Sequence, residues 1–190
     1  ALDELAAWYG GQGRRLIVQV PSTDPALDAL LAGRGMVVEA PVDVLVATPS
    51  PSARIVRGTI GAAVEVAVTV GVDADWAAQY AAVHGDDERS RARVAAYGRM
   101  LADLGPSAIA AVARCDGELA GVGFGVRERG WLGVFCMGTA PTHRRRGVAR
   151  AVLGALADGR DAYLQVEVDN PGAQALYLSA GFTPSHRYHY

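Results

Sequence analysis

Residues 141–150 read PTHRRRGVAR, in which three consecutive arginines precede a glycine and an Ala/Val-rich run. An apolar stripe at Val148, Val152 and Leu156 predicts a helix over residues 145–157. The arginines then fall in its first turn, where backbone N–H groups lack partners and the helix dipole is positive. Three interpretations follow: a nucleic-acid patch, a solvated basic turn, or the mouth of an anion site.

The composition bounds the class of protein. The chain has 190 residues, of which 51% are hydrophobic and 20% charged, and its formal net charge is −2. This balance predicts a compact protein without the positive field that gathers nucleic acid or an acidic membrane, so neither partner is expected. The N-terminal ALDELAAWYG is no signal peptide and no apolar run reaches ~20 residues, so we expect neither export nor a membrane span.

The cysteines and histidines give no metal pattern. Cys115 and Cys136 lie far apart without a CxxC motif, which favours reduced thiols in a cytoplasmic protein. His186 and His189 have no third ligand in sight, and His143 is interpreted as a surface residue. We therefore predict no metal site.

The patterning predicts three parts along the chain. Residues 1–48 form an N-terminal β-α-β segment, with a strand over 14–21, a capped helix over 24–35 and extended chain over 36–47. Residues 49–61 form a turn-rich linker. Residues 62–190 form the main domain.

The order of elements in the main domain predicts a mixed α/β fold. Helix 145–157 lies between two strands and requires a parallel crossover, whereas the strands before it form an antiparallel meander. We thus expect a mostly antiparallel sheet with one parallel strand pair and flanking helices. The predicted strands cover residues 62–70, 107–114, 118–126, 131–139, 162–168 and 182–190, and the remaining helices cover 73–83, 86–104 and 170–181.

Two segments of the chain are alike. DPALDALLAGRGM at residues 24–36 aligns without gaps to NPGAQALYLSAGF at residues 170–182, and Leu31 stands at the position of Tyr177. The similarity indicates either a duplicated domain or two ordinary capped Ala/Leu helices that end in glycine. Both interpretations stay open.

RRRGVA at residues 144–149 matches RxxGxA, the pyrophosphate-binding signature of the GNAT superfamily of N-acetyltransferases. LQVEVDNPGAQALYLSAGF at residues 164–182 resembles the next strand and helix of that family, with Asn170 and Tyr177 in register. The resemblance implies a GNAT-type acyl-CoA N-acyltransferase fold. It also makes residues 1–48 a degenerate half of the same fold.

The resemblance further implies a site for acetyl-CoA, without a metal. Backbone N–H groups of residues 145–150 would bind the pyrophosphate, and the strand at 137–139 would run along the pantetheine arm, which fits a slot between splayed strands. Gly138 is predicted as the site of a strand bulge. The full set of predicted acetyl-CoA-binding residues is Met137, Gly138, Thr139, Arg144, Arg145, Arg146, Gly147, Val148, Ala149, Arg150, Asn170, Ala173 and Tyr177.

Transfer of an acetyl group to an amine needs a proton donor for the thiolate and a base for the amine. Tyr177 is the predicted donor, with a core aromatic as the alternative, and Asn170 also fits an ordinary helix N-cap. Some relatives carry a glutamate where this chain has Gln165, so Glu167 is the predicted base, with a surface carboxylate or a water relay as alternatives.

The acceptor is a small amine or a protein N-terminus, and the oligomeric state stays open. A non-catalytic acyl-CoA-binding module is the alternative function.

Overall fold

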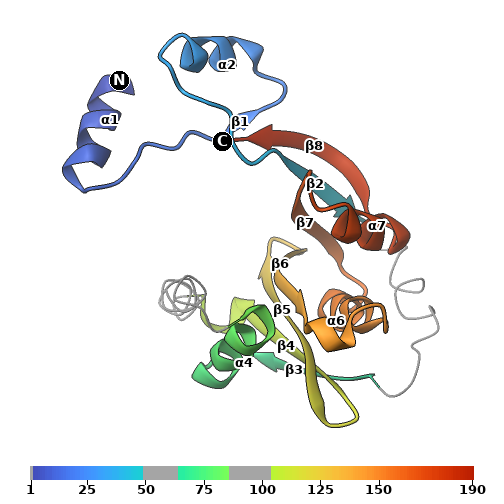
Figure 1. Cartoon of the computed structure of the whole chain (residues 1–190). Coiled ribbons are helices and arrows are strands. Elements are labelled where there is room, and N and C mark those ends of the chain that lie inside the picture. The colour runs from blue at the N-terminus through green and yellow to red at the C-terminus, as the bar shows by residue number, and fades with distance from the viewer. Residues whose placement is uncertain (1, 49–63, 86–103) are drawn as a thin grey trace.

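A computed structural model describes residues 2–48, 64–85 and 104–190, which form a single mixed sheet with helices on both faces (Figure 1). The strand order is β1-β8-β2-β7-β6-β5-β4-β3. The strands are β1 (Val20–Pro21), β2 (Val42–Ala47), β3 (Val64–Val70), β4 (Ala108–Cys115), β5 (Glu118–Glu128), β6 (Trp131–Thr139), β7 (Asp161–Glu167) and β8 (Thr183–His189). The helices are α1 (Leu2–Gly11), α2 (Pro25–Ala32), α4 (Ala74–His84), α6 (Val148–Ala157) and α7 (Pro171–Ser179).

The main half of the sheet confirms the predicted fold class. Strands β3 to β6 form an antiparallel meander, and β7 pairs with β6 in parallel. Helix α6 makes the crossover between β6 and β7, as the sequence pattern requires. The predicted linker at 49–61 and the helix predicted over 86–104, except for Leu104 at its end, lie outside the described residues.

Helix α6 packs closely on one face of the sheet because two glycines of β5 leave room for it. Its buried residues include Val148 and Val152. A Cβ added at Gly121 would lie 2.6 Å from Val148 Cγ1, and one added at Gly123 would lie 2.5 Å from Val152 Cγ1. These contacts fix the start of α6 against the sheet, where it borders the site described below.

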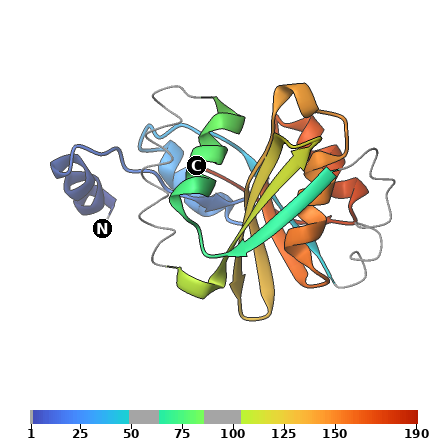
Figure 2. The ribbon, with the colours of Figure 1, turned by 90° about the horizontal axis from the view of Figure 1, so that it is seen from below.

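Helix α4 covers the opposite face, so the sheet is the middle layer of three (Figure 2). Trp76, Tyr80 and Val83 of α4 are buried against strands β4 and β5. The Trp76 indole donates a hydrogen bond to the carbonyl of Ala111 at 3.3 Å. The packing holds the C-terminal end of α4 beside β6.

The N-terminal segment contributes to the same sheet. Strand β2 lies between β7 and β8 and pairs antiparallel with both, so the predicted boundary at residue 48 does not separate two sheets. Of the strand predicted over 14–21, only Val20–Pro21 forms, paired with β8 alone at the edge, and Pro21 has no N–H to extend the ladder. Strands β1 and β2 do not pair with each other, because β8 stands between them.

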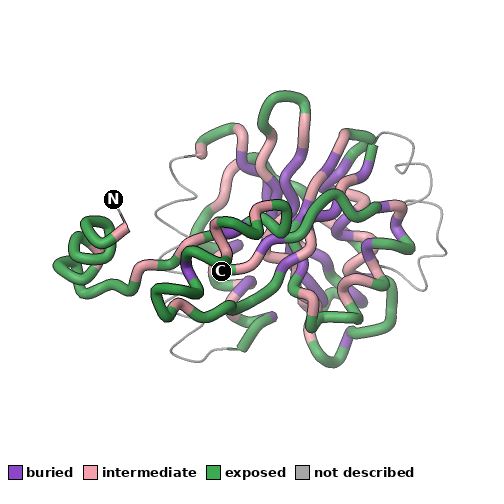
Figure 3. Tube along the Cα trace, turned by 90° about the horizontal axis from the view of Figure 1, so that it is seen from above, coloured by how far each residue is buried: buried purple, intermediate pink, exposed green. Residues whose placement is uncertain are grey.

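Helix α1 has no buried residue, unlike the strands at the centre of the molecule (Figure 3). Its Trp8 side chain is 59% exposed. None of the described helices is both long and apolar enough to cross a membrane.

Candidate active site

A cleft of about 850 Å³ lies where four elements meet: the end of α4, the second half of β6, the loop that leads into α6, and α7. It gathers residues that are far apart in the sequence. Every predicted coenzyme-binding residue except Arg146 lines it, and so does Tyr177, whereas Glu167 does not. The signature loop, the end of β6 and helix α7 therefore meet at one place.

The cleft opens where β6 and β7 separate. The two strands pair from Trp131 and Asp161 as far as Val134 and Leu164, and the rest of β6 pairs only with β5. An extra residue in β6 shifts the register opposite β5, and Cys136 has a φ of +52° there. The strand bulge is thus at Cys136 and not at the predicted Gly138, so a residue with a Cβ takes the left-handed conformation.

Helix α6 begins at Val148, three residues later than predicted. Two residues before it have left-handed backbone: Arg145 with a φ of +62° and Gly147 with a φ of +84°. Left-handed residues interrupt the helical hydrogen-bond pattern, which is why the apolar stripe extends the predicted helix too far into the loop. The three consecutive arginines, residues 144–146, therefore belong to the loop and not to the first turn.

The loop and first turn leave a run of backbone donors unpaired. The first helical hydrogen bond runs from the N–H of Ala151 to the carbonyl of Gly147 at 3.0 Å. In the described part of the chain, no backbone carbonyl accepts from the N–H groups of residues 145–150. Six consecutive donors near the positive end of a helix form a site for an anion.

The arginine side chains do not all serve this site. Arg144 and Arg145 line the cleft, and their guanidinium groups have no hydrogen bond or ion pair with another described residue. Arg146 lies 3.6 Å from Asp116 and does not line the cleft. Arg150 donates to Ser179 Oγ at 2.6 Å, which ties α6 to the end of α7.

Helix α7 closes the cleft with Asn170 and Tyr177, which both line it. Asn170 Oδ1 accepts the N–H of Ala173 at 3.1 Å, so the residue is a helix N-cap whose amide NH₂ is left for another partner. The Tyr177 side chain is only 7% exposed, and burial raises its pKa to about 12. The phenol is therefore protonated throughout the neutral range.

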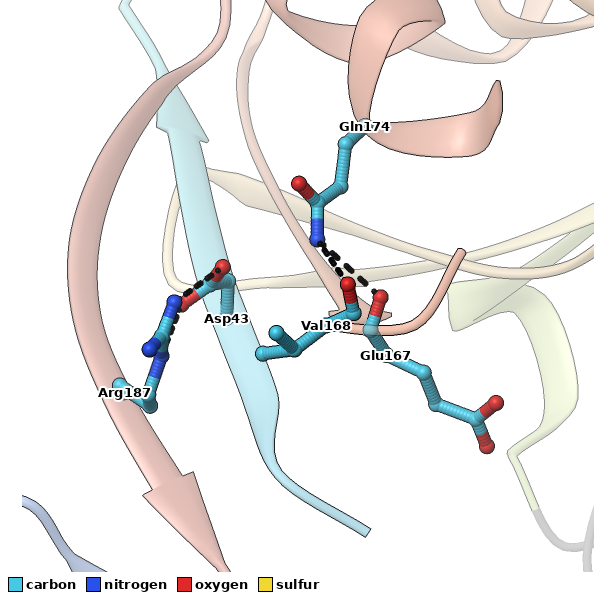
Figure 4. A network of polar contacts seen from close by, with 5 residues as sticks. All are labelled: Asp43, Glu167, Val168, Gln174 and Arg187. Atoms are coloured by element: carbon cyan, nitrogen blue, oxygen red, sulfur yellow. Dashed lines mark hydrogen bonds and ion pairs between the residues drawn. The ribbon is translucent and has the colours of Figure 1, made fainter. Parts of the chain in front are cut away.

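Glu167 lies at the end of β7, and its side chain is exposed. Its carbonyl accepts from Gln174 Nε2 at 3.2 Å, and Figure 4 shows its carboxylate extending away from that contact. The neighbouring Gln174 contact with the Val168 carbonyl, at 3.1 Å, fixes the start of α7. The role predicted for Glu167 stays a prediction.

Two histidines differ from what the sequence predicted. His84, the last residue of α4, lines the cleft, although nothing in its local sequence marks it. His143 is buried, not a surface residue, and its ring contacts Thr142 Oγ1 at 3.0 Å and Glu118 at 3.6 Å. Among the described residues, no group of three His, Cys, Asp or Glu side chains could hold a metal ion.

The comparisons with known proteins agree with this geometry. Residues 73–182 match the family described as "Acetyltransferase (GNAT) family". No curated protein matches the chain.

Solved structures have the same fold at low sequence identity. A GCN5-related N-acetyltransferase from Kribbella flavida matches with a TM-score of 0.72 and 21% identity, over 100% of this chain and 72% of that one. A tandem GNAT protein from the clavulanic acid biosynthesis pathway matches with a TM-score of 0.67 and 18% identity, over 90% of this chain and 58% of that one, so this chain spans less than two thirds of it. An aminoglycoside N-acetyltransferase in complex with CoA matches with a TM-score of 0.51 and 14% identity, over 66% of this chain and 91% of that one.

Proposed function

Because the chain belongs to the acetyltransferase (GNAT) family, we propose that it transfers an acetyl group from acetyl-CoA to a primary amine by direct attack, with Tyr177 as the general acid for the CoA thiolate. The observation that carries the proposal is the run of unpaired N–H groups at residues 145–150, opening on a cleft that Tyr177 closes. The run fits the two linked phosphates of the coenzyme, since each charge-assisted hydrogen bond contributes about 1.5–3 kcal/mol.

The pantetheine arm fits the slot between β6 and β7. Beyond Val134 the slot side of β6 has no partner strand, which leaves main-chain donors for the amide groups of the arm. Met137, next to the bulge at Cys136, lines the cleft at this level, and its N–H is the proposed donor to the thioester oxygen. Such a donor stabilises the negative charge that develops on that oxygen when the amine attacks.

Tyr177 is suited to protonate the leaving group. Its phenol carries a proton at neutral pH because burial raises its pKa to about 12. It has no hydrogen bond to another described residue, so the hydroxyl is available to the coenzyme sulfur. We expect it to donate as the C–S bond breaks, which prevents the thiolate from returning to the carbonyl.

The proposal is tested first by binding. Acetyl-CoA should raise the melting temperature in proportion to its concentration above Kd, whereas S-acetylpantetheine, which lacks the diphosphate, should not at the same concentrations. Equal shifts with both compounds would show that the loop before α6 does not bind phosphates.

Turnover is tested second, with ethylamine, a polyamine and a peptide with a free N-terminus as acceptors. We expect acetyl-CoA to be consumed with at least one of them. Binding of acetyl-CoA without turnover of any amine would instead favour the non-catalytic acyl-CoA-binding module.

A further inference from the structure

The cleft also contains a histidine, which has no role in the reaction proposed above. The chain has four histidines, all within the described residues, and only His84 lines the cleft. Its ring stacks on that of Tyr80, with the centroids 4.1 Å apart and the planes at 28°. The side chain is therefore held in one orientation at the end of α4.

A hydrogen bond defines which ring nitrogen of His84 carries the proton. Nδ1 lies 3.0 Å from the carbonyl oxygen of Tyr80. A carbonyl only accepts, so Nδ1 must donate, and in the neutral ring Nε2 then holds the lone pair. No other described residue makes a hydrogen bond to Nε2.

The ring edge of His84 formed by Cε1 and Nε2 faces β6 next to its bulge. A Cβ built on Gly138 would overlap with His84 Cε1, and it would lie 2.8 Å from Nε2 and 2.9 Å from Val83 Cγ1. Only a glycine at this position lets the imidazole approach the strand so closely. Gly138 is thus the residue that admits a base to the part of the cleft where the thioester is proposed to lie.

We propose that His84 is the general base of the acyl transfer. This inference rests on the proposed function. Nε2 takes a proton from the attacking amine as the C–N bond forms at the thioester carbonyl; the C–S bond then breaks and Tyr177 protonates the thiolate. The imidazolium afterwards releases its proton, Tyr177 regains one, and the balanced products are an amide and CoA.

The position of His84 favours it over Glu167 for this role. His84 lines the cleft, whereas Glu167 is exposed and does not line it. The other ionisable groups that line the cleft are the guanidinium groups of Arg144, Arg145 and Arg150 and the phenol of Tyr177. None of these accepts a proton at neutral pH.

The test compares His84→Asn with Glu167→Gln and with the control His186→Asn, on the exposed strand β8. Asparagine keeps a donor for the Tyr80 carbonyl but removes Nε2. With ethylamine, His84→Asn should lower kcat about 100-fold and leave the KM for acetyl-CoA unchanged, while the control His186→Asn keeps the wild-type rate and Glu167→Gln loses far less than His84→Asn. With trifluoroethylamine, a far weaker base that is largely uncharged at neutral pH, the loss should be under about 5-fold, since less deprotonation is required.

Two results overturn the assignment. One is an equal loss in His84→Asn with both amines, which indicates a structural role; the other is a full rate in His84→Asn with the loss in Glu167→Gln.

A second readout does not depend on turnover. Long-range ¹H–¹⁵N spectra of the wild-type protein at alkaline pH should place the proton of His84 on Nδ1, and acetyl-CoA should shift its Nε2 signal. A proton on Nε2 contradicts the assignment even in an active enzyme. A wild-type protein that binds acetyl-CoA but acetylates neither amine contradicts the proposed function instead, and its spectrum still decides the tautomer.

Discussion

Two helices begin at the edge of the cleft, and their first turns are built differently. Helix α7 has a side-chain cap, Asn170, and then Pro171, which has no N–H to satisfy. Helix α6 has Gly147 as its N-cap residue and therefore no side-chain cap, and the N–H groups of residues 145–150 find no backbone acceptor in the described chain. The start of α7 is therefore satisfied from within the protein, whereas the start of α6 requires an acceptor from outside it.

The other helices indicate that a side-chain cap is the usual arrangement in this chain. Asp24 caps α2 by accepting from Leu27 at 3.0 Å, and Asp73 caps α4 by accepting from Trp76 at 2.8 Å. With a glycine at the N-cap, the missing side-chain cap costs only about a few tenths of a kcal/mol of stability. The difference between α6 and α7 teaches that the proposed anion site lies where the chain gives up a little local stability and leaves its donors without a side-chain acceptor.

The largest effect is expected where a negative charge enters the α6 site. Gly147→Asp should weaken acetyl-CoA binding about 1,000-fold, because the carboxylate repels the phosphates and competes for the same N–H groups, at a cost of about 4 kcal/mol. The measurement is isothermal titration calorimetry with acetyl-CoA.

Gly130 provides the matched control for this variant. Its φ of +86° is close to the +84° of Gly147, and at both positions an added Cβ would meet no atom within 4 Å. Gly130→Asp should lose the same stability and keep wild-type affinity. Equal affinity losses in both variants would mean that backbone strain, and not the anion site, causes the effect.

The next effect is on the rate and tests α7. Tyr177→Phe should lower kcat about 100-fold with little change in the Kd of acetyl-CoA, since only the proton donor is removed. Steady-state kinetics with ethylamine as acceptor measure the change. An unchanged kcat would leave Tyr177 as a core aromatic that happens to line the cleft.

The same variant should alter the stability of the protein in alkali. Burial raises the pKa of Tyr177 from 10 to about 12, so the stability that the protonated phenol contributes is complete below pH 10 and is lost as the pH rises towards 12. Ionisation of Tyr177 alone should lower the free energy of unfolding by on the order of 2 kcal/mol. Urea unfolding at pH 9 and about pH 11.5 should show a smaller alkaline loss in Tyr177→Phe than in the wild type; equal losses contradict the shift.

A smaller effect separates capping from binding. Asn170→Ala and Asp24→Ala each remove a cap whose hydrogen bond is about 3 Å long, so each should cost about 1 kcal/mol of stability. Only Asn170→Ala should also weaken acetyl-CoA binding, by about 3-fold to 10-fold, because only Asn170 lines the cleft. An equal change of affinity in both variants would show that lower overall stability, and not a lost contact with acetyl-CoA, weakens binding.

The sequence was sufficient to predict the elements whose signals are local. The caps Asp24 and Asn170 and the apolar stripe of α6 each determine structure through neighbours on one helix. Together with the order of elements, these signals predicted the mixed sheet. The coenzyme-binding residues from Met137 to Tyr177 were predicted from the GNAT resemblance, and all of them except Arg146 line the cleft.

Long-range arrangements could not be predicted in this way. The place of β2 between β7 and β8 depends on pairing between segments more than 100 residues apart, and alternation within residues 42–47 says nothing about partners. The bulge at Cys136 was missed because a non-glycine residue occupies the left-handed position. His84 was missed because only the fold of α4 against β6 brings its ring to Gly138.

The smallest effect is expected for the three consecutive arginines, residues 144–146. If the main chain of the loop is the chief anion ligand, then arginine side chains add only screened attraction, worth about 0.5–1 kcal/mol each. Arg145→Ala should therefore weaken acetyl-CoA binding about 3-fold, and Arg146→Ala, which loses only its contact with Asp116, less than 2-fold. Calorimetry at low and high salt measures both, and the Arg145→Ala loss should shrink at high salt. A loss of affinity in Arg145→Ala as large as in Gly147→Asp would mean that a side chain, and not the backbone at the start of α6, provides most of the binding energy. The contrast between α6 and α7 would then no longer explain the site.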